Sequence, residues 1–448
     1  MKAFHAYDIR GIYNSDFNKE DAYKIGFFLP KLMNTTKILI GRDVRISSPE
    51  IYNALCNGVI AAGADVYNAG LCTTPMIYFL TAKFDFEASV MITASHNGKE
   101  YNGMKISRSN ALPVGYANGL NQLEELIKED IHITKEPGQE IEFDKHSIYE
   151  SFLKSYVSEK IQTLDITIDI SNGMAGLFIK KLMGNEPHYL FDELDGNFPN
   201  HEANPLNPEN IVDLQKAVLA NHSDIGVIFD GDADRVMFVD EKGNFISPDL
   251  MIGVLGHYFL KNKTDKQIVL QDIRTSKAVA EYLKKIGNIE MHTWKVGRAF
   301  AAIKLRELDG LWGGELAGHY YFKDFYYSDS GILAMLLILD VIADFNEKGI
   351  SVSELIETIR GYANSGEINY KIKQKKEAME AVREYFSTSE TPSKFLDFDG
   401  YRLEFDDWWF NIRPSNTEPY LRLIVEARSD SILNERLSTI EEIISQFH

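Results

Sequence analysis

Short apolar segments alternate with amphipathic segments along residues 37–95, and no other feature of the sequence constrains the fold as strongly. The segment KILI has the apolar pattern of a buried strand, and residues 49–62 have the periodicity of an amphipathic helix. The same order continues with the strand-like ADVYNAG, a helical stretch at residues 75–83 and the strand-like ASVMIT. Strands that alternate with helices build a parallel sheet, so we predict an α/β domain here.

The chain of 448 residues is too long for one hydrophobic core, and changes of pattern along it suggest four domains. A polar stretch near residues 135–144 interrupts the first α/β pattern, which then resumes. After about residue 360 come the strand-like YRLEF and LRLIVEA, which we expect to form a hairpin, and a C-terminal amphipathic helix. We predict three α/β domains and a smaller C-terminal α+β domain, with bounds at 1–145, 146–246, 247–360 and 361–448.

Charge and cysteine content exclude several classes of function. Lys and Arg number 47 against 66 Asp and Glu, and the net charge of −19 repels nucleic acid and anionic membranes. Cys56 and Cys72 are too few for a disulfide framework. The N-terminus lacks a signal-peptide pattern, and the longest apolar run, residues 332–339, is typical of a buried helix. We expect a cytoplasmic protein with no nucleic-acid or membrane partner.

The segment DGDADR, directly after the apolar IGVIF, places Asp230, Asp232 and Asp234 at alternating positions. In an extended loop these carboxylates project to one side and can converge on a hard cation such as Mg²⁺ shared with a phosphate. A calcium-binding helical hand fits less well, because its sixth position is Arg235 where glycine is required. A solvated acidic turn remains an alternative.

Two further segments offer phosphate chemistry. Ser95 and His96 follow the strand-like ASVMIT, at the sheet edge where parallel strands present ligand sites, so Ser95 is a candidate nucleophile as well as a candidate helix cap. The segment RPSNTEP combines one guanidinium with hydroxyl and amide donors, which suits a phosphate dianion, although it also suits a simple turn. Its candidate residues are Arg413, Ser415, Asn416 and Thr417.

Other candidates carry a weaker signal. In WGGELAGHYYF, Glu315 and His319 can exchange hydrogen bonds with sugar hydroxyls, and the glycines allow close approach of a ligand. The remaining candidates are cations and one tyrosine that surface ion pairs would also explain: Tyr7 and Arg10 in YDIRG, Lys105 in YNGMK and Arg298 in WKVGRAF.

Taken together and in this order, YDIRG, TASHN with YNGMK, DGDADR, GGELAGH and RPSNTEP resemble the signature set of the α-D-phosphohexomutase family, over nearly the whole chain. The resemblance implies three related α/β domains and a smaller fourth domain around a central cleft. It also implies that the enzyme interconverts hexose 1-phosphate and hexose 6-phosphate through a phosphoserine and a hexose 1,6-bisphosphate, which serves as activator as well. Monomers or dimers that bind hexose phosphates are expected.

The same resemblance assigns roles to residues of this chain. Ser95 carries the phosphoryl group, and its phosphate binds Mg²⁺ together with Asp230, Asp232 and Asp234. Arg235 binds the phosphoserine, while Arg10, His96 and Lys105 lie around the transferring phosphoryl group. We expect desolvation to let Lys105 act as general acid or base near neutral pH. By the same resemblance, the sugar and the phosphate that is not transferred are bound by Tyr7, Arg298, Glu315, His319, Arg413, Ser415, Asn416 and Thr417.

Some positions depart from the pattern of the family. Gly98 stands where the family commonly has proline, Ala317 where it often has serine, and Arg298 where related mannomutases often have histidine. The extended GGELAGHYYF segment is most similar to phosphomannomutases and to phosphomannomutase/phosphoglucomutases. We rank mannose phosphate first, glucose phosphate second and glucosamine phosphate third. A magnesium-dependent sugar phosphatase and a non-catalytic sugar-phosphate binding protein are the alternatives from other classes.

Overall fold

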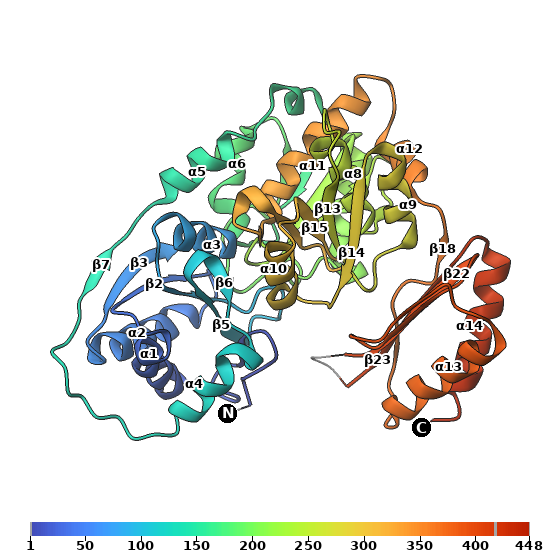
Figure 1. The fold of residues 1–448 in the computed structure, drawn as a ribbon. Helices are drawn as coiled ribbons and strands as arrows, with labels where there is room; N and C mark the ends of the chain where they lie inside the picture. Colours follow the sequence, from blue (N-terminus) through green and yellow to red (C-terminus); the bar gives the residue numbers. More distant parts are fainter. Residues whose placement is uncertain (1, 416–418, 448) are drawn as a thin grey trace.

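The computed structural model describes residues 2–415 and 419–447. Three sheets flanked by helices are followed along the chain by an antiparallel sheet with two helices on one face (Figure 1). This is the predicted division into three α/β domains, called domains I to III below, and a C-terminal α+β domain, called domain IV. Among the described residues, no helix is both long and apolar enough to cross a membrane.

Domain I contains a mixed sheet with strand order β1-β5-β4-β2-β3-β7, and β6 pairs with β5. The strands predicted around KILI, ADVYNAG and ASVMIT are parallel neighbours. The parallel arrangement predicted for these three strands is confirmed, and the sheet continues with β5, for which no strand was predicted and which runs antiparallel to β1 and β4. A short loop at residues 93–100 joins β4 to β5, and a connection of that length permits antiparallel pairing. The elements are β1 (Ile9–Ile12), α1 (Lys19–Met33), β2 (Lys37–Arg42), α2 (Ser48–Ala61), β3 (Asp65–Leu71), α3 (Thr74–Lys83), β4 (Ala88–Ile92), β5 (Tyr101–Arg108), β6 (Leu112–Pro113), α4 (Leu120–Leu126) and β7 (Glu140–Glu142).

Domain II has the strand order β12-β11-β10-β8-β9. The predicted pair IGVIF and VMFVD forms an antiparallel ladder in which Phe229 faces Val236, so residues 230–235 form the connecting loop. All ten residues of the two strands are buried, and they hold the polar loop from both sides. The elements are α5 (His146–Lys154), β8 (Ile166–Asp169), α6 (Ile179–Met183), β9 (His188–Leu190), α7 (Val212–Asn221), β10 (Ile225–Phe229), β11 (Val236–Asp240) and β12 (Phe245–Ile246).

Domain III has the strand order β14-β13-β15-β16-β17, in which the first three strands are parallel. The pair β15 and β16 is antiparallel and encloses the segment ELAGH, residues 315–319, so this segment is a loop between strands. The elements are α8 (Leu250–Phe259), β13 (Gln267–Asp272), α9 (Lys277–Ile286), β14 (Ile289–Trp294), α10 (Arg298–Glu307), β15 (Trp312–Gly314), β16 (Tyr320–Phe322), β17 (Ser328–Asp329), α11 (Gly331–Asn346) and α12 (Val352–Ile359).

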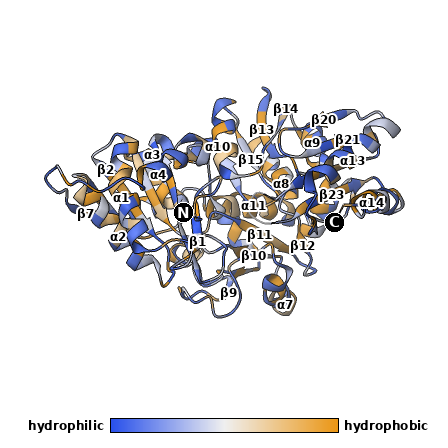
Figure 2. Cartoon of the chain, turned by 90° about the horizontal axis from the view of Figure 1, so that it is seen from below, coloured by the Kyte–Doolittle hydropathy of each residue, from blue (hydrophilic) through white to orange (hydrophobic). Residues whose placement is uncertain are grey.

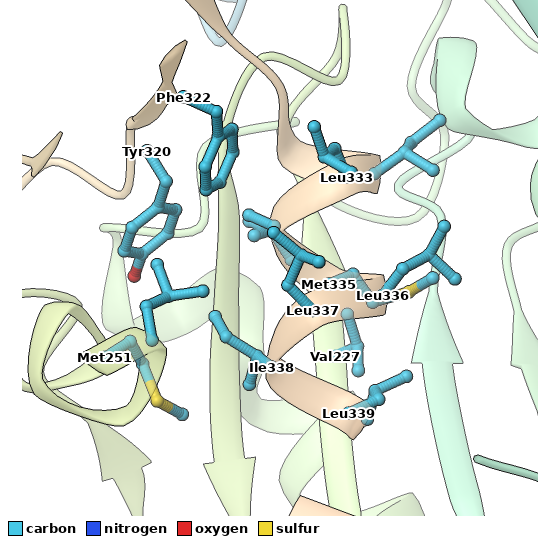
Figure 3. Packing of buried hydrophobic residues seen from close by; sticks show 14 of the residues in the cluster. Val227, Met251, Tyr320, Phe322, Leu333, Met335, Leu336, Leu337, Ile338 and Leu339 are labelled. Atoms are coloured by element: carbon cyan, nitrogen blue, oxygen red, sulfur yellow. The ribbon is translucent and has the colours of Figure 1, made fainter. Parts of the chain in front are cut away.

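Helix α11 lies in a hydrophobic core to which domains I, II and III all contribute. Nearly every residue from Gly331 to Ala343 is buried, as expected for a helix that is apolar all round. Figure 3 shows its side chains packed between Val227 of β10 and Met251 of α8, with aromatic rings of β16 nearby. In Figure 2, α11 and the adjacent strands are mainly orange, whereas exposed loops are mainly blue. The predicted buried helix is therefore confirmed, and it fixes domains II and III relative to each other.

Domain IV is an antiparallel sheet with strand order β18-β23-β22-β21-β20 and a core of its own. The predicted hairpin of YRLEF and LRLIVEA is wrong, because β22 lies between these strands and pairs with both. The strand β22, WWFNIRP, is buried along almost its whole length, including the polar Asn411 and Arg413, so its burial does not alternate as it does in a half-exposed strand. The elements are β18 (Ala363–Asn364), β19 (Ile368–Tyr370), α13 (Lys375–Ser389), β20 (Lys394–Leu396), β21 (Tyr401–Glu404), β22 (Trp408–Pro414), β23 (Leu421–Ala427) and α14 (Asp430–Ile444).

Candidate active site at the junction of three domains

The serine loop, residues 93–100, brings Ser95 against the acidic loop of domain II. Ser95 Oγ donates a hydrogen bond of 2.8 Å to Asp230 Oδ2, across 135 positions of sequence. The serine is buried and has φ of 53°, a left-handed conformation that non-glycine residues rarely adopt. Its backbone N–H donates to Thr93 Oγ1 at 2.9 Å, which helps to hold this conformation. A strained, buried hydroxyl beside a carboxylate is an arrangement typical of a reactive group.

Close contact between the two loops depends on Gly231. A Cβ atom at this position would lie 2.5 Å from the carbonyl oxygen of Ser95, which is too short for any real contact. The alternation of aspartates with small residues in DGDADR therefore has a steric purpose as well as the predicted electrostatic one. The loop is also fixed from domain I, since Thr74 Oγ1 donates to Asp232 Oδ2 at 2.5 Å, and from α11, since the Gly331 N–H donates to the Ala233 carbonyl.

The carboxylates of Asp230, Asp232 and Asp234 converge as predicted. All three are fully buried, and one oxygen from each lies within 4.8 Å of the others. Burial and the charges of Asp234 and Asp232 raise the pKa of Asp230 well above its usual value. Oδ1 of Asp232 and Oδ1 of Asp234 are buried without a hydrogen-bond partner within the described residues. Since buried carboxylate oxygens of this kind are satisfied by a hard cation, the cluster fits a magnesium ion.

Lys105 in β5 partly neutralises this cluster. Its Nζ donates to Asp232 Oδ2 at 2.7 Å and also to Asp234 Oδ2. Burial alone would lower the pKa of Lys105, but the two carboxylates outweigh it and raise the pKa above the usual value. This differs from the expectation that desolvation would bring Lys105 toward neutral pH, which did not consider how close the aspartates lie. In this arrangement Lys105 is an ammonium ion.

Arg10 and His96 lie beside the serine loop. Arg10 donates to Asn97 Oδ1 at 2.7 Å and is held by Asp8. His96 Nδ1 lies 3.4 Å from Ser95 Oγ. Desolvation, together with Arg235, Arg10 and other cations, lowers the pKa of His96 well below its usual value, so the ring is neutral at pH 7. Two predicted residues thus lie around the serine, one as a cation and one as a neutral imidazole.

Arg235 and His319 join the acidic loop to domain III. Arg235 Nε donates to His319 Nε2 at 3.0 Å, and the backbones of the two residues form an isolated β-bridge. Because Nε2 accepts this bond, the ring proton must lie on Nδ1, which is 2.7 Å from Asp329 Oδ2. Burial would raise the pKa of Asp329, but His319 and Arg298 hold it below the usual value. These two hydrogen bonds, from His319 to Asp329 and from Arg235 to His319, fix the position of the Arg235 guanidinium.

Arg298 and Tyr7 lie where domains I and III meet. Arg298 Nε donates to Asp329 Oδ1 at 3.0 Å, and its guanidinium lies 3.5 Å from the ring centre of Tyr78 in domain I. Tyr7 Oη donates to the Val296 carbonyl at 3.2 Å. These contacts give both residues a function in holding the two domains together, in addition to the sugar contacts that the resemblance implies.

The sugar loop, residues 315–319, is rigidly held. Tyr321 Oη donates to Glu315 Oε1 at 2.6 Å, and the Gly297 N–H donates to Glu315 Oε2 at 3.2 Å. The Leu316 N–H donates to Asp272 Oδ2 at 3.0 Å. Burial and the nearby charge of Asp272 raise the pKa of Glu315 despite its hydrogen bonds.

The predicted phosphate loop of domain IV is described in part. Arg413 is buried in β22, and its Nε donates to Asp399 Oδ1 at 3.2 Å. Asp399 Oδ2 in turn accepts the Val296 N–H, next to the glycine that contacts Glu315. The Ser415 N–H donates to the Tyr420 carbonyl at 2.9 Å. Asn416 and Thr417 lie outside the described residues.

Several residues around the site were not found from the sequence. They are buried polar groups that hold the loops: Asp43, Arg45, Thr74, Asp272, Arg274 and Asp329. A signal for four of them was present, because RDVR and QDIR each place Asp and Arg two positions apart at the end of an apolar strand. Two such copies, about 230 residues apart, indicate an internal repeat that the residue identities around them obscure.

Four domain models of one family match the chain in order. They are the phosphoglucomutase/phosphomannomutase α/β/α domain I at residues 1–133, domain II at 146–243, domain III at 247–362 and the C-terminal domain at 367–443. These matches span nearly all of the 448 residues. The chain therefore belongs to the phosphoglucomutase/phosphomannomutase family and is an enzyme of the phosphohexomutase class.

Curated relatives agree with this family. The chain is 35% identical to a phosphomannomutase of Methanocaldococcus jannaschii, over 100% of this chain and 98% of the relative. It is 36% identical to phosphohexose mutases of Xanthomonas campestris, over 97% of both chains. Both similarities extend through all four domains.

Solved structures share the fold. A phosphoglucomutase/phosphomannomutase family protein of Burkholderia thailandensis matches with a TM-score of 0.85 and 27% identity, over 99% of this chain and 97% of that one. An N-acetylphosphoglucosamine mutase of Aspergillus fumigatus, solved with GlcNAc-6P and magnesium, matches with a TM-score of 0.57 and 14% identity, over 83% and 90% of the two chains. At that identity the second match supports the fold alone.

Proposed function

We propose that this phosphohexomutase interconverts mannose 1-phosphate and mannose 6-phosphate, with glucose phosphates as the second substrate pair. The observation that carries the proposal is the hydrogen bond of 2.8 Å from Ser95 Oγ to Asp230, within a buried cluster of three aspartates. The preference for mannose is supported by the similarity to a phosphomannomutase over the whole chain. Glucosamine phosphate ranks third.

The proposed reaction has two phosphoryl transfers. In the first, the P–O bond to Ser95 Oγ breaks while a new bond forms to the free hydroxyl of a hexose monophosphate, which gives a hexose 1,6-bisphosphate. The bisphosphate turns over, and its other phosphate returns to Ser95 Oγ, so phosphate is conserved. Added bisphosphate acts as activator because it can phosphorylate Ser95 directly.

Magnesium held by Asp230, Asp232, Asp234 and the Ser95 phosphate would neutralise charge on the transferring group. A relative of the same fold, the N-acetylphosphoglucosamine mutase of A. fumigatus, was solved with magnesium. The cations of this chain contribute to the same end: Arg235, fixed by His319, is proposed to bind the phosphoserine, and Arg10 is proposed to bind the phosphoryl group in transit.

Proton transfer is assigned to Lys105. The attacking hydroxyl loses a proton, and Ser95 Oγ gains one when its P–O bond breaks. Lys105 is an ammonium ion between Asp232 and Asp234, so it can supply the proton that Ser95 Oγ requires and regain one from the hydroxyl. His96 is neutral, and its Nδ1 lies within hydrogen-bonding distance of Ser95 Oγ, so it adds no charge beside the serine.

Substrate recognition is assigned to the loops of domains III and IV. Glu315 and His319 are proposed to bind sugar hydroxyls, with Tyr7 and Arg298 at the edge of the same site. Arg413, Ser415, Asn416 and Thr417 are proposed to bind the phosphate that is not transferred. A series of hydrogen bonds supports this assignment. Arg413 donates to Asp399, Asp399 accepts the Val296 N–H, and the adjacent Gly297 N–H donates to Glu315 of the sugar loop. A cytoplasmic location and a monomeric or dimeric state remain predictions.

The test is an assay of both sugars with phosphate release measured in parallel. Mannose 1-phosphate and glucose 1-phosphate are incubated with magnesium and a trace of hexose 1,6-bisphosphate. We expect both 6-phosphates to form, mannose faster, without release of inorganic phosphate. Release of phosphate without isomerisation would favour a sugar phosphatase, and binding without turnover would favour a sugar-phosphate binding protein. A faster reaction with glucosamine 1-phosphate would overturn the order of substrates.

A further inference from the structure

A buried arginine of domain I holds almost the whole serine loop. Arg45 has no exposed surface, and its guanidinium donates to four backbone carbonyl groups. One terminal nitrogen, Nη2, donates to Ser95 at 2.8 Å and to Asn97 at 2.7 Å. The other, Nη1, donates to Gly98 at 2.7 Å and to Tyr101 at 3.2 Å. A planar, permanently charged fork is the side chain best suited to gather several carbonyl oxygens.

Arg45 is itself fixed from two directions. Asp43 Oδ2 accepts from Arg45 Nε at 3.1 Å, and Asp43 Oδ1 accepts the Arg45 backbone N–H at 3.0 Å. From domain II, the ring of Phe198 covers the guanidinium at 5.0 Å, and Gly196 forms a β-bridge with Arg45. The arginine is therefore oriented by its own domain and covered by the neighbouring one.

The serine loop needs such an anchor. Ser95 has a left-handed backbone, which costs free energy and persists only where the surroundings impose it. At position 98 this chain has glycine, which adds backbone freedom to the loop when it is not held. Arg45 contacts the carbonyl of both residues, so it restrains the strained position and the freest position together.

We propose that Arg45 is the positioning residue that sets Ser95 Oγ for phosphoryl transfer, with Asp43 and Phe198 holding it in place. Arg45 acts through the backbone of the serine loop and not on the substrate. Phe198 belongs to domain II, which also carries the acidic loop. Through this contact, the position of domain II determines how firmly Arg45 holds the serine loop. This inference rests on the proposed role of Ser95 as phosphoryl carrier.

The test compares Arg45→Met and Arg45→Lys with Arg306→Met as a matched control. Arg306 also donates to two backbone carbonyls, of Asn110 and Tyr326, and lies over the ring of Tyr327 at 4.9 Å, away from the serine loop. We expect kcat of Arg45→Met to fall about 100-fold while KM changes less than about threefold, because a displaced nucleophile costs rate and not binding. Arg45→Lys, which keeps the charge and some donors, should recover part of kcat, and Arg306→Met should stay within about twofold of wild type.

A second readout separates positioning from general destabilisation. Inorganic phosphate released per turnover should rise in Arg45→Met, because a misplaced phosphoserine is open to water, and should not rise in Arg306→Met. If Arg45→Met does not fold, Arg45→Lys decides by the same two measurements. Wild-type activity with equal kcat in the Arg45 variants and the control would overturn the role of Arg45 and leave the proposed function intact. A wild-type enzyme without phosphate on Ser95 would instead overturn the proposed function.

Discussion

Domains I and III use the same turn at the end of a central strand. Asp43 follows β2 and Asp272 ends β13, and each is followed two positions later by a buried arginine. In both turns one carboxylate oxygen accepts the backbone N–H of that arginine, at 3.0 Å for Arg45 and 2.7 Å for Arg274. The other oxygen accepts its Nε, at 3.1 Å and 3.2 Å.

The two turns hold their loops with opposite polarity. In domain I the arginine donates to the carbonyls of the serine loop. In domain III the aspartate accepts the Leu316 N–H of the sugar loop, while Arg274 approaches Glu315 at 4.0 Å and Glu367 at 3.5 Å. The same turn therefore anchors the serine loop in one domain, and in the other it supports the loop of residues 315–319 and contacts Glu367 of domain IV.

The largest expected effect is a difference in stability between variants that lack the aspartate of one turn or the other. Asp43→Ala leaves the fully buried Arg45 without its carboxylate, and we expect a loss of about 3–5 kcal/mol. Asp272→Ala should cost less, about 1–3 kcal/mol, because Arg274 keeps Glu367 as a partner. Thermal unfolding of both variants under identical conditions measures the difference. Equal losses would show that the two arginines do not differ in this way.

The contact between domains III and IV at Glu426 should contribute a stability that depends on pH. Glu426 of β23 accepts from Ser276, at the start of α9, and from Trp409, both at 2.7 Å, and burial together with Asp249 raises its pKa to about 7. Since the unfolded chain loses this proton near pH 4.5 and the folded chain near pH 7, the stability that Glu426 contributes falls as pH rises through that window.

Glu426→Gln removes this titration. The stability of wild type relative to Glu426→Gln should therefore decrease by up to about 3 kcal/mol between pH 4.5 and pH 8. Unfolding of both proteins across this range tests the expectation. If the stabilities of wild type and Glu426→Gln changed with pH in parallel, the expectation would be contradicted, and the contacts of domain IV with domain III would not depend on the titration of Glu426.

Arg274→Met sharpens the contrast with Arg45 through kinetics. Because Arg274 lies beside Glu315 and Glu367, its loss should disturb sugar binding more than phosphoryl transfer. We expect KM to rise about 10-fold, which corresponds to about 1.4 kcal/mol, while kcat changes less than about threefold. Steady-state kinetics with mannose 1-phosphate measures both. A fall in kcat at constant KM would mean that both arginines serve the same purpose.

Domain II contains a third and weaker version of the turn. Asp169 at the end of β8 accepts the Ser171 N–H at 2.8 Å, but its second oxygen faces His201 at 3.1 Å, a residue from a distant loop. We expect His201→Asn to cost only about 1 kcal/mol, because one hydrogen bond is lost and the aspartate keeps another. If His201→Asn lost as much stability as Asp43→Ala, the turn in domain II would be as important for stability as the turn in domain I.

Local motifs predicted which polar side chains come together better than they predicted the residues that hold them. Ser95 and the three aspartates carry their signal in short segments, and the structure brings them together. The segment RDVR marks Arg45, but the serine loop that Arg45 holds lies 50 positions further along the chain and cannot be inferred from that segment. Asp329 carries no such signal, because its partner His319 lies on another element and the contact depends on packing. The pKa of Lys105 was misjudged for the same reason, since burial was foreseen and the distance to Asp232 was not.

Fold prediction succeeded where periodicity was strong. The first α/β segments and α11 have clear patterns and occur as expected. The strand β22 was missed, because its burial does not follow the polarity of its residues: Asn411 and Arg413 are buried beside the apolar side chains. Antiparallel β5 was also missed, since direction depends on the length of the connecting loop and on pairing with β1, which begins near the N-terminus.

Phosphorylation of Ser95 is the most direct measurement of the central claim. Wild type and Ser95→Ala are treated with hexose 1,6-bisphosphate and magnesium, and the phosphate is located by intact mass and peptide mapping. We predict one phosphoryl group on Ser95 of wild type, none on the variant, and its transfer to added mannose 1-phosphate as bisphosphate. Isomerisation that continues in Ser95→Ala, or phosphate located on another residue, would contradict the claim.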